Sequence, residues 1–138
     1  MGRGMRGRVL AGGTAHGRAL VLDEPLSFWG GVDPGSGAII DARHPQLGAS
    51  VAGRVLVMTS VRGSSSSSSV LAETIRAGCG PAAVLLGEPD LILAVGAAVA
   101  EELYGSRLPV VQLAPDDMRA IPDDAPVSIS EGGEVSVG

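Results

Sequence analysis

Residues 55–78 read VLVMTSVRGSSSSSSVLAETIRAG, and this stretch decides the fold. It opens with four consecutive apolar residues, Val55–Met58, which is the pattern of a strand buried on both faces. Six serines follow, and behind them apolar residues recur at helical spacing until Gly78, which is a typical helix stop. Four residues share one face of this predicted helix: Val70, Leu71, Thr74 and Ile75.

The same alternation continues toward the C-terminus. Residues 82–86 form a second apolar run, and Asp90 can cap a helix that begins at Leu91 and ends before Gly105. A third apolar run follows Pro109. Strands and helices that alternate over short links are typical of a parallel sheet with right-handed crossovers. We therefore predict parallel strands at 55–58, 82–86 and 110–113, covered by helices at 67–77 and 91–104.

Further strands are expected outside this core. Short apolar runs at 8–10 and 18–22 predict two strands, with His16 in the glycine-rich turn between them, and residues 38–40 are a third candidate. Residues 127–129 and 134–137 flank Gly132-Gly133, which is the pattern of a hairpin. The predicted fold class is α/β, in one domain over 1–138, with a parallel βαβαβ core and additional β-strands from both termini.

Composition excludes several function classes. The chain has 138 residues and a net charge of −5, and its one basic cluster is Arg3, Arg6 and Arg8, so nucleic acid is not expected as a partner. The single cysteine, Cys79, cannot form an intrachain disulfide or hold an iron–sulfur cluster alone, and we expect it to be a small buried residue. No metal site is predicted. No apolar run reaches the roughly 20 residues of a membrane span, and no secretory signal is visible, so we expect no membrane and a cytoplasmic location.

The strongest chemical motif is RGSSS at 62–66, between the predicted strand and helix. The start of a helix leaves backbone N–H groups without partners and carries partial positive charge. Gly63 lets a ligand come close to the backbone, serine hydroxyls can donate hydrogen bonds, and Arg62 can pair with an anion. The motif therefore predicts a carboxylate or phosphate site, and a serine there could act as a base. The alternative is that one serine caps the helix and the others only fill a tight turn.

Two other segments are weaker candidates. Phe28, Trp29 and Gly30 lie in a glycine-rich loop of a chain that contains only three aromatic residues, so this loop either covers a ligand, docks on a partner or closes the core locally. His44 could act as an acid or base near neutral pH, or make local hydrogen bonds in a loop. Four further acids are expected to be solvated in loops: Asp116, Asp117, Asp123 and Asp124.

Several motifs taken together resemble the small subunit of aconitase X. The resemblance covers roughly residues 8–113, and the combination of motifs is specific although each one alone is weak. The segments that carry it are FWGGVDP at 28–34, Gly37, Ile40-Asp41, His44-Pro45, VAGRVL at 51–56, RGSSS at 62–66, PAA at 81–83 and ILAVG at 92–96.

The resemblance implies a swivelling β/β/α domain that pairs with a larger subunit carrying an iron–sulfur cluster. It implies a hydro-lyase that removes water from a small hydroxy acid. In the wider superfamily the first serine of a Gly-Ser-Ser loop is the catalytic base, which places the base at Ser64, with Ser65 as the alternative register. The family arginine after the serines is absent, because Ser66 stands in its place. We therefore expect Arg62, Gly63 and Ser66 to bind substrate, and Phe28, Trp29, Gly30 and His44 to belong to a partner or active-site loop.

Two substrates are known for such complexes: cis-3-hydroxy-L-proline, which gives a pyrroline-2-carboxylate, and mevalonate 5-phosphate. The serine run and the segment Glu101–Gly105 look more like bacterial members, which favours cis-3-hydroxy-L-proline. The rival interpretation is a non-catalytic module that uses the serine loop to bind an anionic metabolite.

Overall fold

The computed structural model describes residues 3–60 and 66–138. The elements, in chain order, are β1 (Arg3–Arg6), β2 (Arg8–Ala11), β3 (Ala15–Val21), α1 (Phe28–Gly31), β4 (Val55–Met58), α2 (Ser67–Arg76), β5 (Ala83–Leu86), α3 (Leu91–Tyr104), β6 (Val110–Gln112), α4 (Pro115–Arg119), β7 (Pro126–Ile129) and β8 (Glu134–Val137). The predicted βαβαβ core is confirmed, because β4, β5 and β6 are parallel neighbours and the two helices follow the first two of them.

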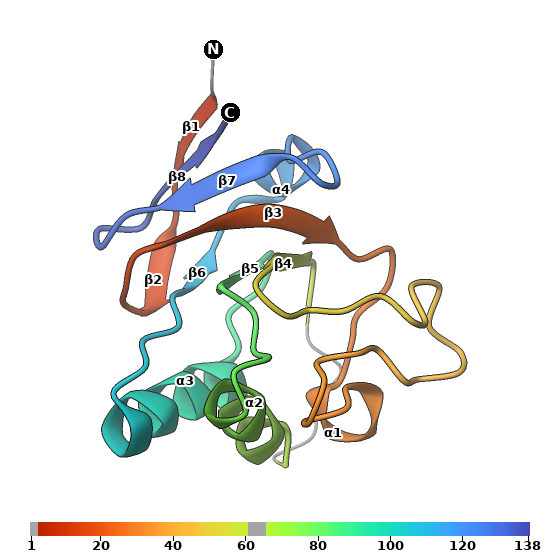
Figure 1. Ribbon diagram of the computed structural model, residues 1–138. Coiled ribbons are helices and arrows are strands. Elements are labelled where there is room, and N and C mark those ends of the chain that lie inside the picture. Colours follow the sequence, from red (N-terminus) through yellow and green to blue (C-terminus); the bar gives the residue numbers. More distant parts are fainter. Residues whose placement is uncertain (1–2, 61–65) are drawn as a thin grey trace.

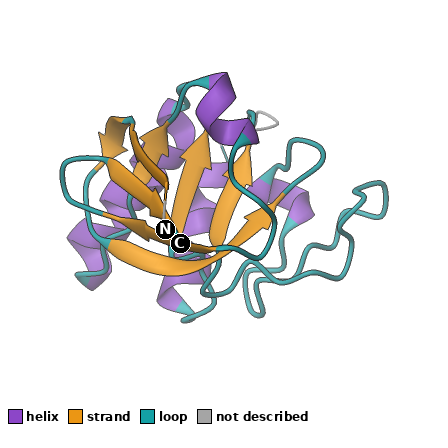
Figure 2. Ribbon diagram, turned by 90° about the horizontal axis from the view of Figure 1, so that it is seen from above, coloured by secondary structure: helices purple, strands orange, loops and turns teal. Residues whose placement is uncertain are grey.

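Strand β3 joins two parts of the sheet. The strand order is β1-β8-β7-β3-β4-β5-β6-β2. The first half of β3 pairs antiparallel with β7, and its second half, from Ala19 to Val21, pairs parallel with β4. The first and last strands lie side by side because β1 pairs with β8, and α2 and α3 cover the face of the sheet that points away from these two strands (Figure 1). Seen from above, the strands lie over these helices (Figure 2).

The apolar strands are buried on both faces, as their unbroken pattern predicts. Leu56 and Leu86 belong to a core between the sheet and the helices, whereas Val57 and Leu85 belong to a second core under β7, β8 and α4. Each of these four side chains is at most 2% exposed. The result is the β/β/α layering expected for this fold.

The helix ends follow the capping signals in the sequence. The Asp90 carboxylate accepts the backbone N–H of Leu93 at 3.0 Å and so caps α3. Gly105 ends α3 with a left-handed φ of 69°, where a side chain would be strained. Every helix in the described part of the chain is too short or too polar to cross a membrane.

Helices α2 and α3 touch through their backbones at Gly96. A Cβ atom at this position would lie 2.9 Å from the Ser68 carbonyl oxygen and 3.1 Å from its Cα. No rotamer change could relieve these contacts, because both atoms are backbone. The absence of a side chain at Gly96 therefore sets how closely α3 approaches the first turn of α2.

Three sequence predictions need correction, and one strand was not predicted. Residues 38–40 form only isolated bridges, because Ala38 pairs with Ser50 and Ile39 with Val32 at single positions. His16 lies within β3 and not in a turn, since pairing with β7 extends that strand back to Ala15. Asp116 and Asp117 begin the short helix α4, with Pro115 at its first position. Strand β1 was not predicted, because its glycine- and arginine-rich sequence has no apolar alternation.

Candidate functional site

The RGSSS motif lies only in part within the described residues. Val61, Arg62, Gly63, Ser64 and Ser65 are not described. Ser66 is exposed and immediately precedes α2, and its carbonyl accepts the Val70 N–H at 3.2 Å. Thr59 and Ser60 follow the end of β4. The run therefore connects the carboxyl end of a central parallel strand to the amino end of a helix, where ligands commonly bind in α/β sheets.

Ser67 ties the aromatic loop to the start of α2. Its hydroxyl lies 3.2 Å from the Ser27 hydroxyl and accepts the backbone N–H of Trp29 at 3.3 Å. Ser67 is fully buried, so no solvent competes for these bonds. Two segments forty residues apart in sequence are thus held together beside the serine run. This role of Ser67 was not predicted, although Ser67 lies one turn before Leu71 on the predicted buried face of the helix.

Replacing Ser67 by alanine should lower the free energy of unfolding by about 1–3 kcal/mol, because the Trp29 N–H and the Ser27 hydroxyl lose a buried partner. Urea unfolding of the isolated chain measures this difference. The matched control is Ser69→Ala, in the same helical turn but exposed, which should stay within about 0.5 kcal/mol of the original chain. Equal effects of the two substitutions would contradict the tethering role of Ser67.

The two adjacent aromatic residues have opposite environments. Phe28 is completely buried in the core beneath the helices, whereas Trp29 is 60% exposed. The backbone separates them, because Trp29 has an extended ψ of 117° and Gly30 a left-handed φ of 76°. Phe28 therefore closes the core locally, whereas covering a ligand or docking on a partner stays a prediction for the exposed Trp29.

His44 makes local hydrogen bonds. Its ring is 5% exposed, its Nδ1 accepts the backbone N–H of Gln46 at 3.0 Å, and its Nε2 lies 3.0 Å from the Glu24 carbonyl oxygen. A carbonyl can only accept, so the Nε2 nitrogen is the donor in this bond. Both ring nitrogens take part in hydrogen bonds that join two loops. This agrees with the second role that the sequence allowed for His44, that of making local hydrogen bonds in a loop.

The loop after Trp29 is held by an ordered turn. Asp33 accepts hydrogen bonds from the Ser36 hydroxyl at 2.7 Å and from the Gly35 N–H at 3.2 Å. These bonds favour the charged carboxylate and lower the pKa of Asp33. Ile40 returns to this loop, where its backbone N–H donates to the Gly31 carbonyl at 2.9 Å, and its side chain is exposed.

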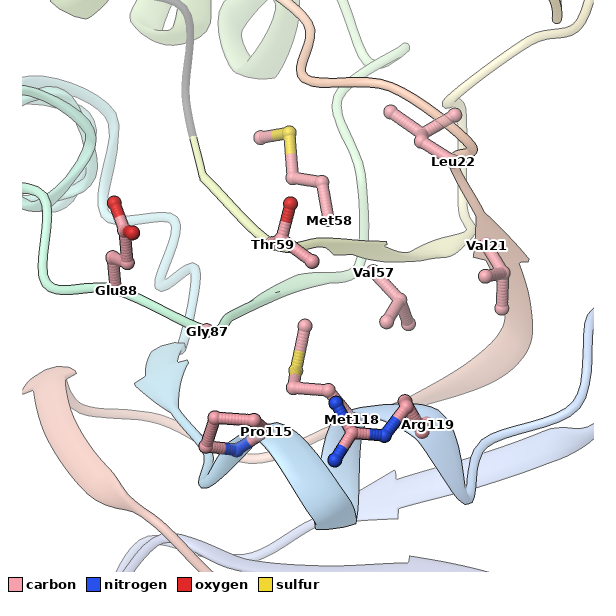
Figure 3. Close-up of a pocket in the computed structure, with 10 residues that line it drawn as sticks. All are labelled: Val21, Leu22, Val57, Met58, Thr59, Gly87, Glu88, Pro115, Met118 and Arg119. Carbon is pink, nitrogen blue, oxygen red and sulfur yellow. The ribbon is translucent and has the colours of Figure 1, made fainter.

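An apolar pocket of about 260 Å³ opens at the carboxyl ends of the parallel strands β4 and β5, the edge of the sheet from which the serine run starts. Figure 3 shows the residues that line it. Val57 and Met118 point into it from β4 and α4, and Thr59, Glu88 and Arg119 bring polar groups to its lining. Arg119 also pairs with Asp116. Because most of the lining is apolar, the pocket suits a hydrocarbon group better than a carboxylate.

The described residues do not fit an iron–sulfur cluster. Among residues 3–60 and 66–138, no three His, Cys, Asp or Glu side chains lie together as metal ligands would. Cys79 is buried, as expected, and its thiol donates to the Pro34 carbonyl at 3.2 Å.

Comparison with known proteins decides the family. Residues 4–137 match the family model described as the aconitase X swivel domain. The chain belongs to the aconitase X swivel-domain family. The solved structure of Thermococcus kodakaraensis aconitase X in its holo-form superposes on this swivel domain with a TM-score of 0.88, at 32% identity, over 99% of this chain and 98% of that one.

Two relatives of known name match most of this swivel domain but differ in length. The cis-3-hydroxy-L-proline dehydratase of Pseudomonas aeruginosa is 50% identical over 117 residues, which are 83% of this chain. This chain spans only 20% of the length of that protein. The phosphomevalonate dehydratase small subunit of Methanothermobacter thermautotrophicus is 36% identical over 118 residues, which are 86% of each chain.

Proposed function

We propose that this swivel domain supplies the serine loop to the active site of a hydro-lyase that dehydrates cis-3-hydroxy-L-proline to a pyrroline-2-carboxylate. The observation that carries the proposal is the 50% identity with the Pseudomonas dehydratase, compared with 36% and 41% for two phosphomevalonate dehydratase small subunits of archaea. The position of the serine run, between a parallel strand and a helix start, supports a role in binding a carboxylate.

A serine of the run is proposed as the base. Dehydration requires loss of the proton on the carbon beside the carboxylate and departure of hydroxide from the neighbouring carbon. Ser64 follows Gly63 and is separated from the first residue of α2 by two residues, so it is close in sequence to N–H groups that can stabilise a deprotonated oxygen. Ser65 is the alternative base. Arg62 is proposed to bind the substrate carboxylate, with Gly63 and Ser66 providing backbone and hydroxyl contacts.

The reaction is proposed to need a larger partner, present as a separate subunit or as the remainder of a longer chain. The described residues here hold no metal-ligand set, whereas the region matched by this domain makes up only 20% of the Pseudomonas relative. An iron–sulfur cluster in that larger part would supply the Lewis acid that assists hydroxide departure.

The proposal is tested by assaying the swivel domain together with the large aconitase X chain of the same organism. Dehydration of cis-3-hydroxy-L-proline by the mixture, and by neither component alone, is the expected result. Activity on mevalonate 5-phosphate instead would correct the substrate. Binding of these acids to the isolated swivel domain without turnover in the mixture would favour the anion-binding module.

Replacing Trp29 by alanine should weaken assembly with the large chain by about tenfold or more, since exposed aromatic side chains are frequent anchors at interfaces. Its 60% exposure means that the free energy of unfolding should change by less than about 1 kcal/mol. Assembly is measured by titrating the large chain and unfolding by urea. Unchanged affinity would assign Trp29 no part in docking.

A further inference from the structure

Helix α3 has an apolar face that no described residue covers. Nine large hydrophobic side chains are exposed in the described part of the chain, and five of them lie on this one helix. These five are Leu91, Val95, Val99, Leu103 and Tyr104. Between Leu91 and Ala100 the sequence contains no polar residue at all. A helix with one side in water normally carries polar residues there, so the exposed side of α3 is unusual for a free surface.

Four of these five residues, all except Tyr104, form a continuous stripe that is separate from the packed side of the helix. Leu91, Val95 and Val99 follow one another at four-residue spacing, which places them on one face, and Leu103 continues the series. The opposite face is occupied by Leu93, Gly96, Ala97 and Ala100, which are buried. The stripe is therefore not needed for packing within this domain.

The stripe begins at the edge of the sheet that carries the serine run. Helices α2 and α3 follow the parallel neighbours β4 and β5, so both helices start at the same edge. The contact of Gly96 with Ser68 joins the first turn of α2 to the second turn of α3. Leu91, which is 74% exposed, thus lies at this edge, and the stripe extends away from it.

We propose that the outer face of α3 is a docking surface for the larger, cluster-bearing part of the aconitase X enzyme; this rests on the function proposed above. The Pseudomonas relative has four fifths of its length outside the region matched by this domain, which is ample chain to cover the stripe. The stripe is continuous with the edge at which the serine run must meet that part. The partner surface is expected to be apolar, with a basic group opposite Glu102.

Charge argues against a membrane as the occupant. Glu101 and Glu102 flank the far end of the stripe, and Glu88 precedes its start. The chain as a whole has a net charge of −5. Helices that lie on membranes are usually rich in Lys and Arg on their polar face, and anionic lipids would repel this helix.

The test is a double substitution, Leu91→Asp with Val95→Gln. Leu91 is the first residue of α3, where an acidic side chain favours the helix, so the domain should remain folded. We expect at least a tenfold loss of affinity for the tagged large aconitase X chain of the same organism, measured by titration. The matched control compares Val99→Gln with Val9→Gln, because both valines are 39% exposed and Val9 lies on β2 beside Gly133, away from the stripe.

Each outcome decides the proposal. Loss of affinity with the double variant and Val99→Gln, but not with Val9→Gln, supports it. Wild-type affinity in the double variant overturns it while leaving the proposed function intact. A self-associating domain that becomes monomeric on the double substitution would make a second copy the occupant. A wild-type domain that neither binds the large chain nor supports dehydration with it would refute the proposed function itself.

Discussion

Replacing Ser64 by alanine should lower kcat for cis-3-hydroxy-L-proline by roughly 10²–10⁴-fold, the usual contribution of a general base. The hydroxyl is the group proposed to take the proton beside the carboxylate. Alanine removes it and adds no bulk, so binding of the large chain and of its cluster should be unchanged. The measurement is steady-state kinetics of the assembled enzyme, with cluster content followed by absorbance.

Two matched serines test the register of the base. Ser65→Ala should cost less than Ser64→Ala, and Ser69→Ala, on the exposed side of α2, should cost little. A Ser64→Ala enzyme within about twofold of wild type would exclude Ser64 and transfer the role to Ser65. A fall in affinity for the large chain would instead indicate that Ser64 contributes to docking.

Phe28→Ala should lower the free energy of unfolding by about 3–5 kcal/mol, the cost of removing a buried aromatic ring. Phe28 is completely buried among residues such as Leu56 and Leu71, and the cavity left by its ring would lie under α1, beside the Ser67 tether. Urea unfolding of the isolated domain measures the loss. A typical domain is stable by only about 5–15 kcal/mol, so partial unfolding of the variant at 37 °C is expected.

Trp29→Ala is the control, because it removes a larger ring from the adjacent position but from a largely exposed site. The two variants should separate the two properties, with Phe28→Ala losing stability and Trp29→Ala losing affinity for the large chain. Equal destabilisation by both substitutions would contradict the environments described for these residues.

The parallel core could be predicted because its signals are local. Val55–Met58 is apolar without interruption, and the strand there is indeed buried on both faces. Asp90 and Gly105 bound α3 at the predicted residues, since capping depends on a few neighbouring groups. The start of β3 at Ala15 was missed, because pairing with β7, more than 100 residues away in sequence, decides where that strand begins.

Features of the site that depend on distant contacts could not be predicted. Residues 28–30 contain no signal that Phe28 turns inward and Trp29 outward, since this depends on the left-handed Gly30 and on the bond to Ser67. In the sequence, His44 cannot be distinguished from a catalytic histidine. Its hydrogen bonds with the Gln46 N–H and the Glu24 carbonyl, which join two loops, are visible only in the structure. The sequence shows that residues 91–100 contain no polar side chain. Which of these residues are exposed could be determined only from the packing of α3 in the structure.

The contact at Gly96 makes α3 and the first turn of α2 a single mechanical unit. Because no side chain lies between the two backbones, no change of rotamer can accommodate a displacement of one helix relative to the other. Any force that shifts α3 along this contact must carry Ser68 with it, and with Ser68 the end of the serine run. A partner bound to the outer face of α3 would therefore also fix the position of Ser68, at the end of the serine run.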